Sequence, residues 1–202
     1  MLTLYHSHQT RSSRMLALIH EFGLQTRVTL KYVSIPRQNG TGGRDPANPH
    51  PEGKVPALTD GDTLITESAA IMLYLSDMFP EAQIGPAVGD AGRGEYLTWL
   101  FWYQGVFEPV YVAAAAELSH PFLTAAFRGV TEVEARLIAA FADGRPYLLG
   151  DKISAADFLI QSPYLWFPDW APKDAKVQAW LERIAQRPAY DWAMQVEAPY
   201  LG

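Results

Sequence analysis

The first eighty residues alternate between short apolar runs and polar turns, a pattern typical of a small α/β domain. Apolar residues recur at helical spacing over residues 15–22 and again over residues 68–78. A Pro/Gly-rich segment, residues 36–53, separates two groups of predicted elements and is predicted to be a loop. Four short runs rich in apolar or β-branched residues predict strands at residues 2–5, 27–33, 55–58 and 63–65.

The order of these elements is strand, helix, strand, loop, strand, strand, helix. The first two strands are joined by a helix and should therefore run parallel. The last two are joined by Asp60-Gly61-Asp62, a hairpin signal, and should run antiparallel. A mixed four-stranded sheet covered by helices is an α/β domain of the thioredoxin-like type.

No strand pattern is evident beyond residue 80. Residues 81–92 have the composition of a linker, so we expect a first domain over residues 1–80 and an all-helical domain over residues 93–202. Pro109 should kink or break the first of these helices. Helical spacing predicts four helices, at residues 93–118, 122–141, 154–164 and 174–186.

Composition and charge narrow the classes of function. The net charge is −6, and no dense Lys/Arg cluster is present, which argues against a nucleic-acid partner and against a basic membrane-binding surface. No apolar run has the length of a membrane span, and the N-terminus lacks a secretion signal, so we expect a soluble, cytoplasmic protein. The absence of cysteine excludes disulfides, thiolate metal sites and a protein thiol nucleophile.

Pro56 stands where the third strand should begin, although proline cannot donate a hydrogen bond to a sheet. A cis bond before Pro56 would turn the Val55 backbone out of the sheet and leave its N–H and C=O unpaired. Such groups can bind an extended peptide by strand addition. An ordinary edge strand with a trans proline is the alternative interpretation.

Glu67 and Ser68 stand where the second helix should begin. The free N–H groups and the positive end of the helix dipole can bind a carboxylate there, Ser68 can donate a hydroxyl, and Glu67 can accept from an ammonium group. Ser68 could equally be a plain helix cap. Together with the unpaired Val55 backbone, the pair predicts a receptor for a small peptide.

Three segments of the chain resemble the glutathione transferase family: GKVPALTDGDTLITESAAIMLYL, LYHSHQTRSSRMLALIHEFGL and GRPYLLGDKISAADFLI. In that family the first of these binds glutathione, the second holds the active-site turn, and the third starts a helix of the C-terminal domain. For glutathione, the resemblance implies contacts from the Val55 backbone, from Glu67 and Ser68, and from Lys54 towards the glycine carboxylate. The third segment also has the features of a capping box, from Ser154 to Asp157.

The resemblance also locates the chemistry. The nucleophile is the glutathione thiolate, which a protein hydroxyl near the start of the first helix stabilises. An ungapped alignment places Thr10 where serine-type members carry their catalytic serine, and Ser12 is the second candidate. Either residue could instead cap the helix. His6 and His8 lack a neighbouring carboxylate and make a poor metal site, so we expect no metal and place them at the substrate entrance.

The resemblance implies an enzyme that adds glutathione to a small hydrophobic electrophile, or substitutes a leaving group, and that forms a homodimer. Tyr103 and Phe107 are the candidate wall of the electrophile pocket, although aromatic residues at this spacing are usually core. Glutathione-dependent peroxidase or isomerase activity uses the same thiolate. A non-catalytic binding or stress protein is the alternative, and the threonine at position 10 keeps it open.

Overall fold

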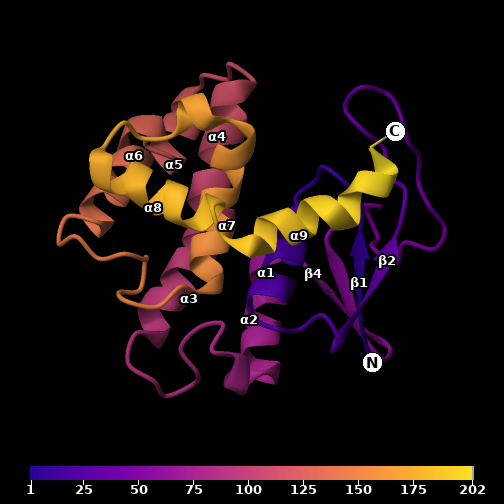
Figure 1. Cartoon of the computed structure of the whole chain (residues 1–202). Helices are drawn as coiled ribbons and strands as arrows, with labels where there is room; N and C mark the ends of the chain where they lie inside the picture. The colour runs from indigo at the N-terminus through magenta and orange to yellow at the C-terminus, as the bar shows by residue number, and fades with distance from the viewer. Residues whose placement is uncertain (202) are drawn as a thin grey trace. The chain divides into compact units, whose positions relative to one another are not determined.

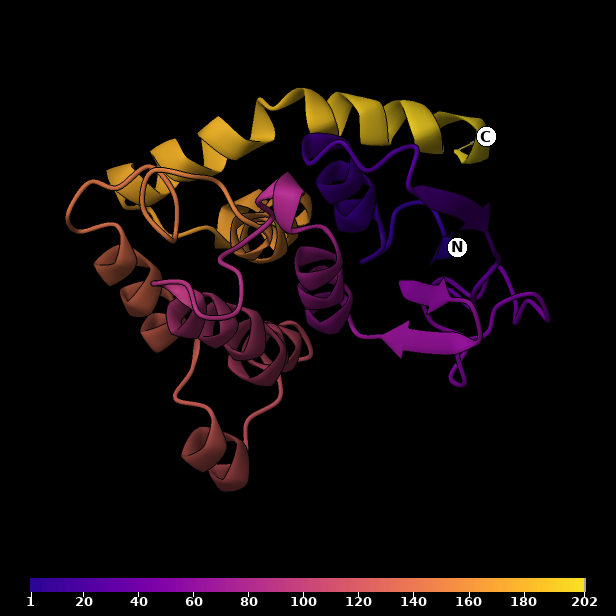
Figure 2. The same cartoon turned by 90° about the horizontal axis from the view of Figure 1, so that it is seen from below.

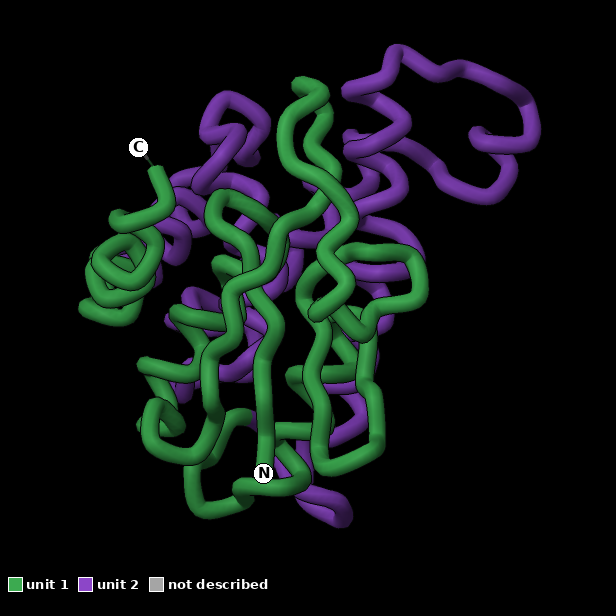
Figure 3. Tube along the Cα trace, turned by 90° about the vertical axis from the view of Figure 1, so that its right-hand side faces the viewer, with its two compact units in different colours: residues 1–84, 186–202 green, residues 85–185 purple. Residues whose placement is uncertain are grey.

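The computed structural model describes residues 1–201 and divides into two compact units (Figure 3). Unit 1 combines Met1–Ile84 with Gln186–Gly202, and unit 2 is Gly85–Ala185. Within the described residues, no helix is both long and apolar enough to cross a membrane.

Unit 1 contains a four-stranded mixed sheet. The strand order is β2-β1-β3-β4, with β1 parallel to β2 and antiparallel to β3, and β3 antiparallel to β4. This arrangement confirms the thioredoxin-like architecture that the sequence predicts. The strands are β1 (Leu2–His6), β2 (Val28–Tyr32), β3 (Ala57–Asp60) and β4 (Thr63–Thr66).

The helices of unit 1 cover this sheet with buried apolar side chains. Helix α1 buries Met15, Leu16 and Leu18 completely, and β1 alternates between buried Leu2 and Leu4 and half-buried residues, as a strand with one face in the core should. These helices are α1 (Ser13–Glu21), α2 (Ser68–Met78), η1 (Pro80–Ala82), α9 (Pro188–Glu197) and η4 (Ala198–Tyr200).

Helix α9 packs along α1, although the sequence analysis assigned residues 186–202 to the helical domain (Figures 1 and 2). Ala189 and Ala193 lie four residues apart and are buried, since small side chains on one helix face allow a close approach. The Arg187 guanidinium hydrogen-bonds both carboxylate oxygens of Glu21, with 2.7 Å from Nε to Oε2. The C-terminal helix is therefore part of the first unit.

Unit 2 is helical. It consists of α3 (Arg93–Trp102), the π-helical segment η2 (Tyr103–Phe107), α4 (Glu108–Ala115), α5 (Pro121–Ala126), α6 (Val130–Ala140), α7 (Ala155–Trp166), η3 (Pro168–Trp170) and α8 (Ala175–Ala185). The helix expected over residues 93–118 is interrupted by the π-segment just before Pro109, which lies in the first turn of α4. The helix expected over residues 122–141 is divided before Gly129, which has a φ of +127°.

Asp157 is fully buried in unit 2 and joins three segments of the chain. Its carboxylate accepts hydrogen bonds from the backbone N–H of Leu148, the backbone N–H of Ser154 and Nε1 of Trp180, each at 2.9 Å. The bond from Ser154 belongs to the capping box that the sequence predicts at the start of α7. Burial raises the pKa of Asp157, and these hydrogen bonds oppose the rise.

Candidate functional site

The register of the sheet brings three of the sequence-predicted segments to one end of unit 1. Tyr5 on β1 pairs with Ala57 on β3, and Ala57 pairs with Thr66 on β4. Two residues after Tyr5 and Thr66, and two residues before Ala57, the chain reaches Ser7, Ser68 and Val55, which therefore lie at the same end of the sheet. The turn after β1 and Val55 are more than forty residues apart in sequence, and strand pairing brings them to this end.

Val55 lies two residues before the start of β3 and does not pair with the sheet. The Val55–Pro56 peptide bond is cis, and β3 begins one residue later, at Ala57. Within residues 1–201, neither the N–H nor the C=O of Val55 has a hydrogen-bond partner. This geometry matches the unpaired backbone that the sequence predicts for a peptide-binding edge.

Helix α2 begins beside this edge. Glu67, its N-cap residue, is exposed and has a φ of +70°, a conformation that a non-glycine residue seldom adopts without a functional reason. Ser68 is the first helical residue and is 4% exposed. Lys54 lies on the other side of Val55 in the sequence, is exposed, and pairs with the carboxylate of Glu52.

Thr10 and Ser12 lie together in the turn between β1 and α1, with their side-chain oxygens 2.7 Å apart. Thr10 is half-buried, and its Oγ1 donates to the Ser7 carbonyl at 2.7 Å and accepts from the Ser12 N–H at 3.1 Å. Ser12 is fully buried, and its Oγ lies 2.7 Å from His6 Nδ1 and accepts from the Ser7 N–H at 3.2 Å. Thr10 therefore keeps access to solvent, whereas Ser12 has a saturated, buried hydroxyl.

Two buried residues, His6 and Glu197, contact the side chains and backbone of this turn. These contacts were not predicted from the sequence. His6 is 3% exposed, so it lies inside the unit and not at an entrance. Burial lowers the pKa of His6 to about 4, and the imidazole is neutral at pH 7. Its Nε2 lies 3.4 Å from Oε1 of Glu197. The alternation of Leu2, Leu4 and His6 along β1 carries a signal for a buried histidine, but nothing in the local sequence pairs it with a residue of α9.

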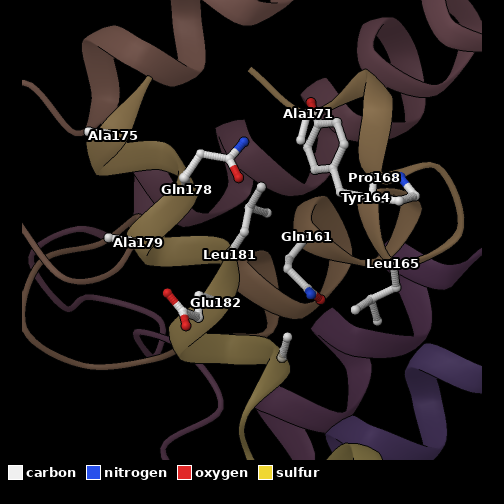
Figure 4. Close-up of a pocket in the computed structure, with 11 residues that line it drawn as sticks. Gln161, Tyr164, Leu165, Pro168, Ala171, Ala175, Gln178, Ala179, Leu181 and Glu182 are labelled. Carbon is white, nitrogen blue, oxygen red and sulfur yellow. The ribbon is translucent and has the colours of Figure 1, made fainter. Parts of the chain in front are cut away.

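Tyr103 and Phe107 are fully buried in unit 2. Their rings stack with centroids 5.2 Å apart, and the Tyr103 hydroxyl donates to Glu108 Oε1 at 3.1 Å. Neither residue lines the open cavity of about 550 Å³ that lies between α7, η3 and α8 (Figure 4). Within the described residues, no group of three or more His, Asp or Glu side chains is arranged to hold a metal ion.

Residues 4–83 match the family model described as "Glutathione S-transferase, N-terminal domain". A glutathione S-transferase of Arabidopsis thaliana, F9, is 31% identical over 69% of this chain and 73% of its own length. The chain belongs to the glutathione S-transferase family. An uncharacterized GST-like protein of Streptococcus mutans is 30% identical over 73% of this chain, and the match spans 63% of that relative's length.

A solved structure of this family has the same architecture. The glutathione S-transferase of a sphingomonad, solved in complex with glutathione, superposes with a TM-score of 0.73 over 97% of this chain and 98% of its own, at 27% identity. The fold of both units is therefore that of a glutathione S-transferase, with a thioredoxin-like sheet and a helical region.

Proposed function

We propose that this chain is a glutathione S-transferase that joins the thiol sulfur of glutathione to a small hydrophobic electrophile. The observation that carries the proposal is the meeting, at one end of the sheet, of the unpaired Val55 backbone, the start of α2 at Ser68 and the accessible hydroxyl of Thr10. These are the three features that a thiol-containing tripeptide needs: a backbone to pair with, a carboxylate site and a donor to sulfur.

The Val55 N–H and C=O pair with the peptide backbone of glutathione, as in the addition of one strand to a sheet edge. The start of α2 and the Ser68 hydroxyl receive the glutamyl carboxylate, because the first N–H groups of a helix and its dipole favour an anion. The Glu67 carboxylate accepts from the glutamyl ammonium group. Lys54 exchanges its exposed partner Glu52 for the glycine carboxylate at the other end of the peptide.

The Thr10 hydroxyl donates a hydrogen bond to the sulfur of glutathione. A free thiol has a pKa of about 8.5, so only a few per cent is thiolate at neutral pH. A hydrogen bond to the charged form lowers that pKa. The thiolate then attacks an electrophilic carbon, and either a leaving group departs with the bonding electrons or a double bond or epoxide opens and takes up a proton. Ser12 stays behind Thr10 and supports its oxygen.

The test measures glutathione binding by calorimetry and the absorbance of the bound thiolate against pH, in the parent protein and in Thr10→Ala, Thr10→Ser and Ser12→Ala. The parent should lower the thiol pKa. Thr10→Ala should lose most of this effect with glutathione still bound, and Thr10→Ser, which keeps the hydroxyl, should retain it. An unchanged thiol pKa in Thr10→Ala would refute the assignment of Thr10.

A non-catalytic, glutathione-binding role is the second candidate, and one observation favours it. In this structure the Thr10 hydroxyl already donates to the Ser7 carbonyl, so it must turn away from this bond to reach a thiolate. This candidate predicts glutathione binding with an ordinary thiol pKa, which the same titration detects.

The oligomeric state and the binding site for the electrophile are also proposed. We propose a homodimer, which sedimentation analysis tests directly. An electrophile pocket walled by Tyr103 and Phe107 stays a prediction, and it requires their buried rings to become accessible. Substitution of Tyr103 by Phe, with KM measured for several electrophiles, tests it.

A further inference from the structure

Glu197, the last residue of α9, brings a carboxylate into the active-site turn. The residue is 7% exposed. Its Oε1 accepts a hydrogen bond from the Ser13 hydroxyl at 2.5 Å, and its Oε2 accepts one from the Gln9 N–H at 3.3 Å. Oε1 also lies 3.4 Å from His6 Nε2. Because neutral His6 carries one ring proton, a carboxylate beside Nε2 favours that proton on Nε2 and leaves Nδ1 as an acceptor.

One chain of hydrogen bonds and one line of buried polar contacts lead from Glu197 to Thr10. The first runs through Ser13, whose Oγ donates to Glu197 and accepts from the backbone N–H of Thr10 at 3.2 Å. The second is a line of contacts: His6 Nε2 lies 3.4 Å from Glu197 Oε1, His6 Nδ1 lies 2.7 Å from Ser12 Oγ, and Ser12 Oγ lies 2.7 Å from Thr10 Oγ1. One carboxylate thus holds the Thr10 backbone through Ser13 and lies beside the buried polar cluster that contacts the Thr10 side chain.

The turn needs such support because Gln9, which precedes Thr10, has a φ of +50°. A non-glycine residue seldom adopts this conformation unless its surroundings enforce it. The Gln9 N–H bond to Glu197 is a direct constraint of that kind.

Aromatic stacking fixes the segment that follows Glu197. The Tyr200 ring stacks on Tyr32 with centroids 3.8 Å apart and an interplanar angle of 2°. The Tyr32 hydroxyl in turn lies 2.5 Å from Nδ1 of His8, in the same turn as Thr10. Contacts just before and just after α9 therefore hold this helix against the rest of unit 1. Arg187 binds Glu21 on α1, and Tyr200 stacks on Tyr32 of β2.

We propose that Glu197 is a positioning residue for Thr10: its buried carboxylate holds the turn from Gln9 to Ser13 in the conformation that presents the Thr10 hydroxyl to a thiol. This inference rests on the proposed function for its chemistry, but the positioning itself is a property of the ligand-free protein. The C-terminal helix is then a component of the active site through Glu197.

The experiment compares Glu197→Gln with the parent protein. Glutamine has nearly the same size and keeps one acceptor oxygen, but it lacks the charge and the second acceptor. The matched control is Asp191→Asn, which removes the same charge from an exposed position of α9. Ser13→Ala removes the link between Glu197 and Thr10 from the other side, and it replaces Glu197→Gln if that variant does not fold.

Two readouts are measured on each variant: the pKa of the bound glutathione thiol, and the hydrogen exchange of the Gln9 and Thr10 amides without ligand. In Glu197→Gln we expect the thiol pKa to rise by about one unit, which is a roughly tenfold loss of thiolate stabilisation. The exchange of both amides should accelerate at least roughly tenfold, with KM for glutathione changing less, because the contacts to the peptide are elsewhere. Asp191→Asn should match the parent.

A Glu197→Gln protein that melts earlier but keeps the parental thiol pKa and exchange rates would overturn the proposal, because Glu197 would then only hold α9 in place. If the parent itself does not lower the thiol pKa, the proposed function fails independently. In that case the hydrogen-exchange rates by themselves test the positioning role of Glu197. Faster exchange of the Gln9 and Thr10 amides in Glu197→Gln upholds this role, and unchanged exchange overturns it.

Discussion

Replacing Ser12 by alanine should destabilise unit 1 while leaving the Thr10 hydroxyl in place. The Ser12 Oγ is fully buried and has four polar neighbours: His6 Nδ1, Thr10 Oγ1, and the N–H and C=O of Ser7. Alanine fills almost the same volume, so packing changes little. The cost arises from the polar groups that lose a partner without gaining water.

The structure indicates which groups these are. The Ser7 carbonyl keeps the hydrogen bond from Thr10, whereas the Ser7 N–H and His6 Nδ1 lose the bonds to Ser12. A buried polar group left unsatisfied costs about 1–3 kcal/mol, so the two groups together should lower the free energy of unfolding of Ser12→Ala by about 2–6 kcal/mol. Thr10→Ala should cost less than about 1 kcal/mol, because water can reach the half-buried position.

Urea unfolding of both variants and the parent measures these free energies, provided that the m-values agree. The two substitutions should have opposite rankings in the two assays: Ser12→Ala loses more stability, and Thr10→Ala loses more thiolate stabilisation. A Ser12→Ala variant as stable as the parent, or a Thr10→Ala variant that is the less stable of the two, would refute it.

Three further predictions concern buried charges and imidazole. The pKa of His6 is about 4 in the folded protein and about 6.5 in the unfolded chain, so the unfolded chain binds more protons between these values. Stability should be complete above pH 6.5 and fall by up to about 3 kcal/mol towards pH 4, and urea unfolding of His6→Gln should show a flatter pH dependence. Arg187→Ala should lower the free energy of urea unfolding by about 1–3 kcal/mol, because Glu21 is only 11% exposed and loses two hydrogen bonds. Asp157→Ala leaves the Trp180 Nε1 and two backbone N–H groups unsatisfied and should cost more than about 3 kcal/mol, measured by the same unfolding assay.

The sheet and the unpaired backbone at Val55 could be predicted because their signals are local. Alternation, the hairpin at Gly61 and the proline before β3 each lie within a few residues of the structure they produce. The helix-starting capping box at Ser154 is a signal of the same kind. Strand pairing then brought Val55 and Ser68 together without further information.

Other features depend on contacts that no local pattern encodes. The choice between Thr10 and Ser12 depends on burial, which the turn sequence HSHQTRSSR does not reveal. The association of α9 with α1 depends on Ala189 and Ala193, residues that are equally common in exposed helices. Glu197 is separated from Ser13 by 184 positions, and only the folded chain brings the two together.

The membership of α9 in unit 1 has a consequence for synthesis on the ribosome. Proteins are made from the N-terminus, and domains generally fold as units as they emerge. Residues 2–78 can pair their strands early, but the carboxylate that holds the turn at Gln9 belongs to residue 197. A nascent chain therefore carries an incompletely fixed turn between β1 and α1 through almost its whole translation. The turn gains its last contacts only after residues 186–201 leave the exit tunnel, when unit 2 has already been made.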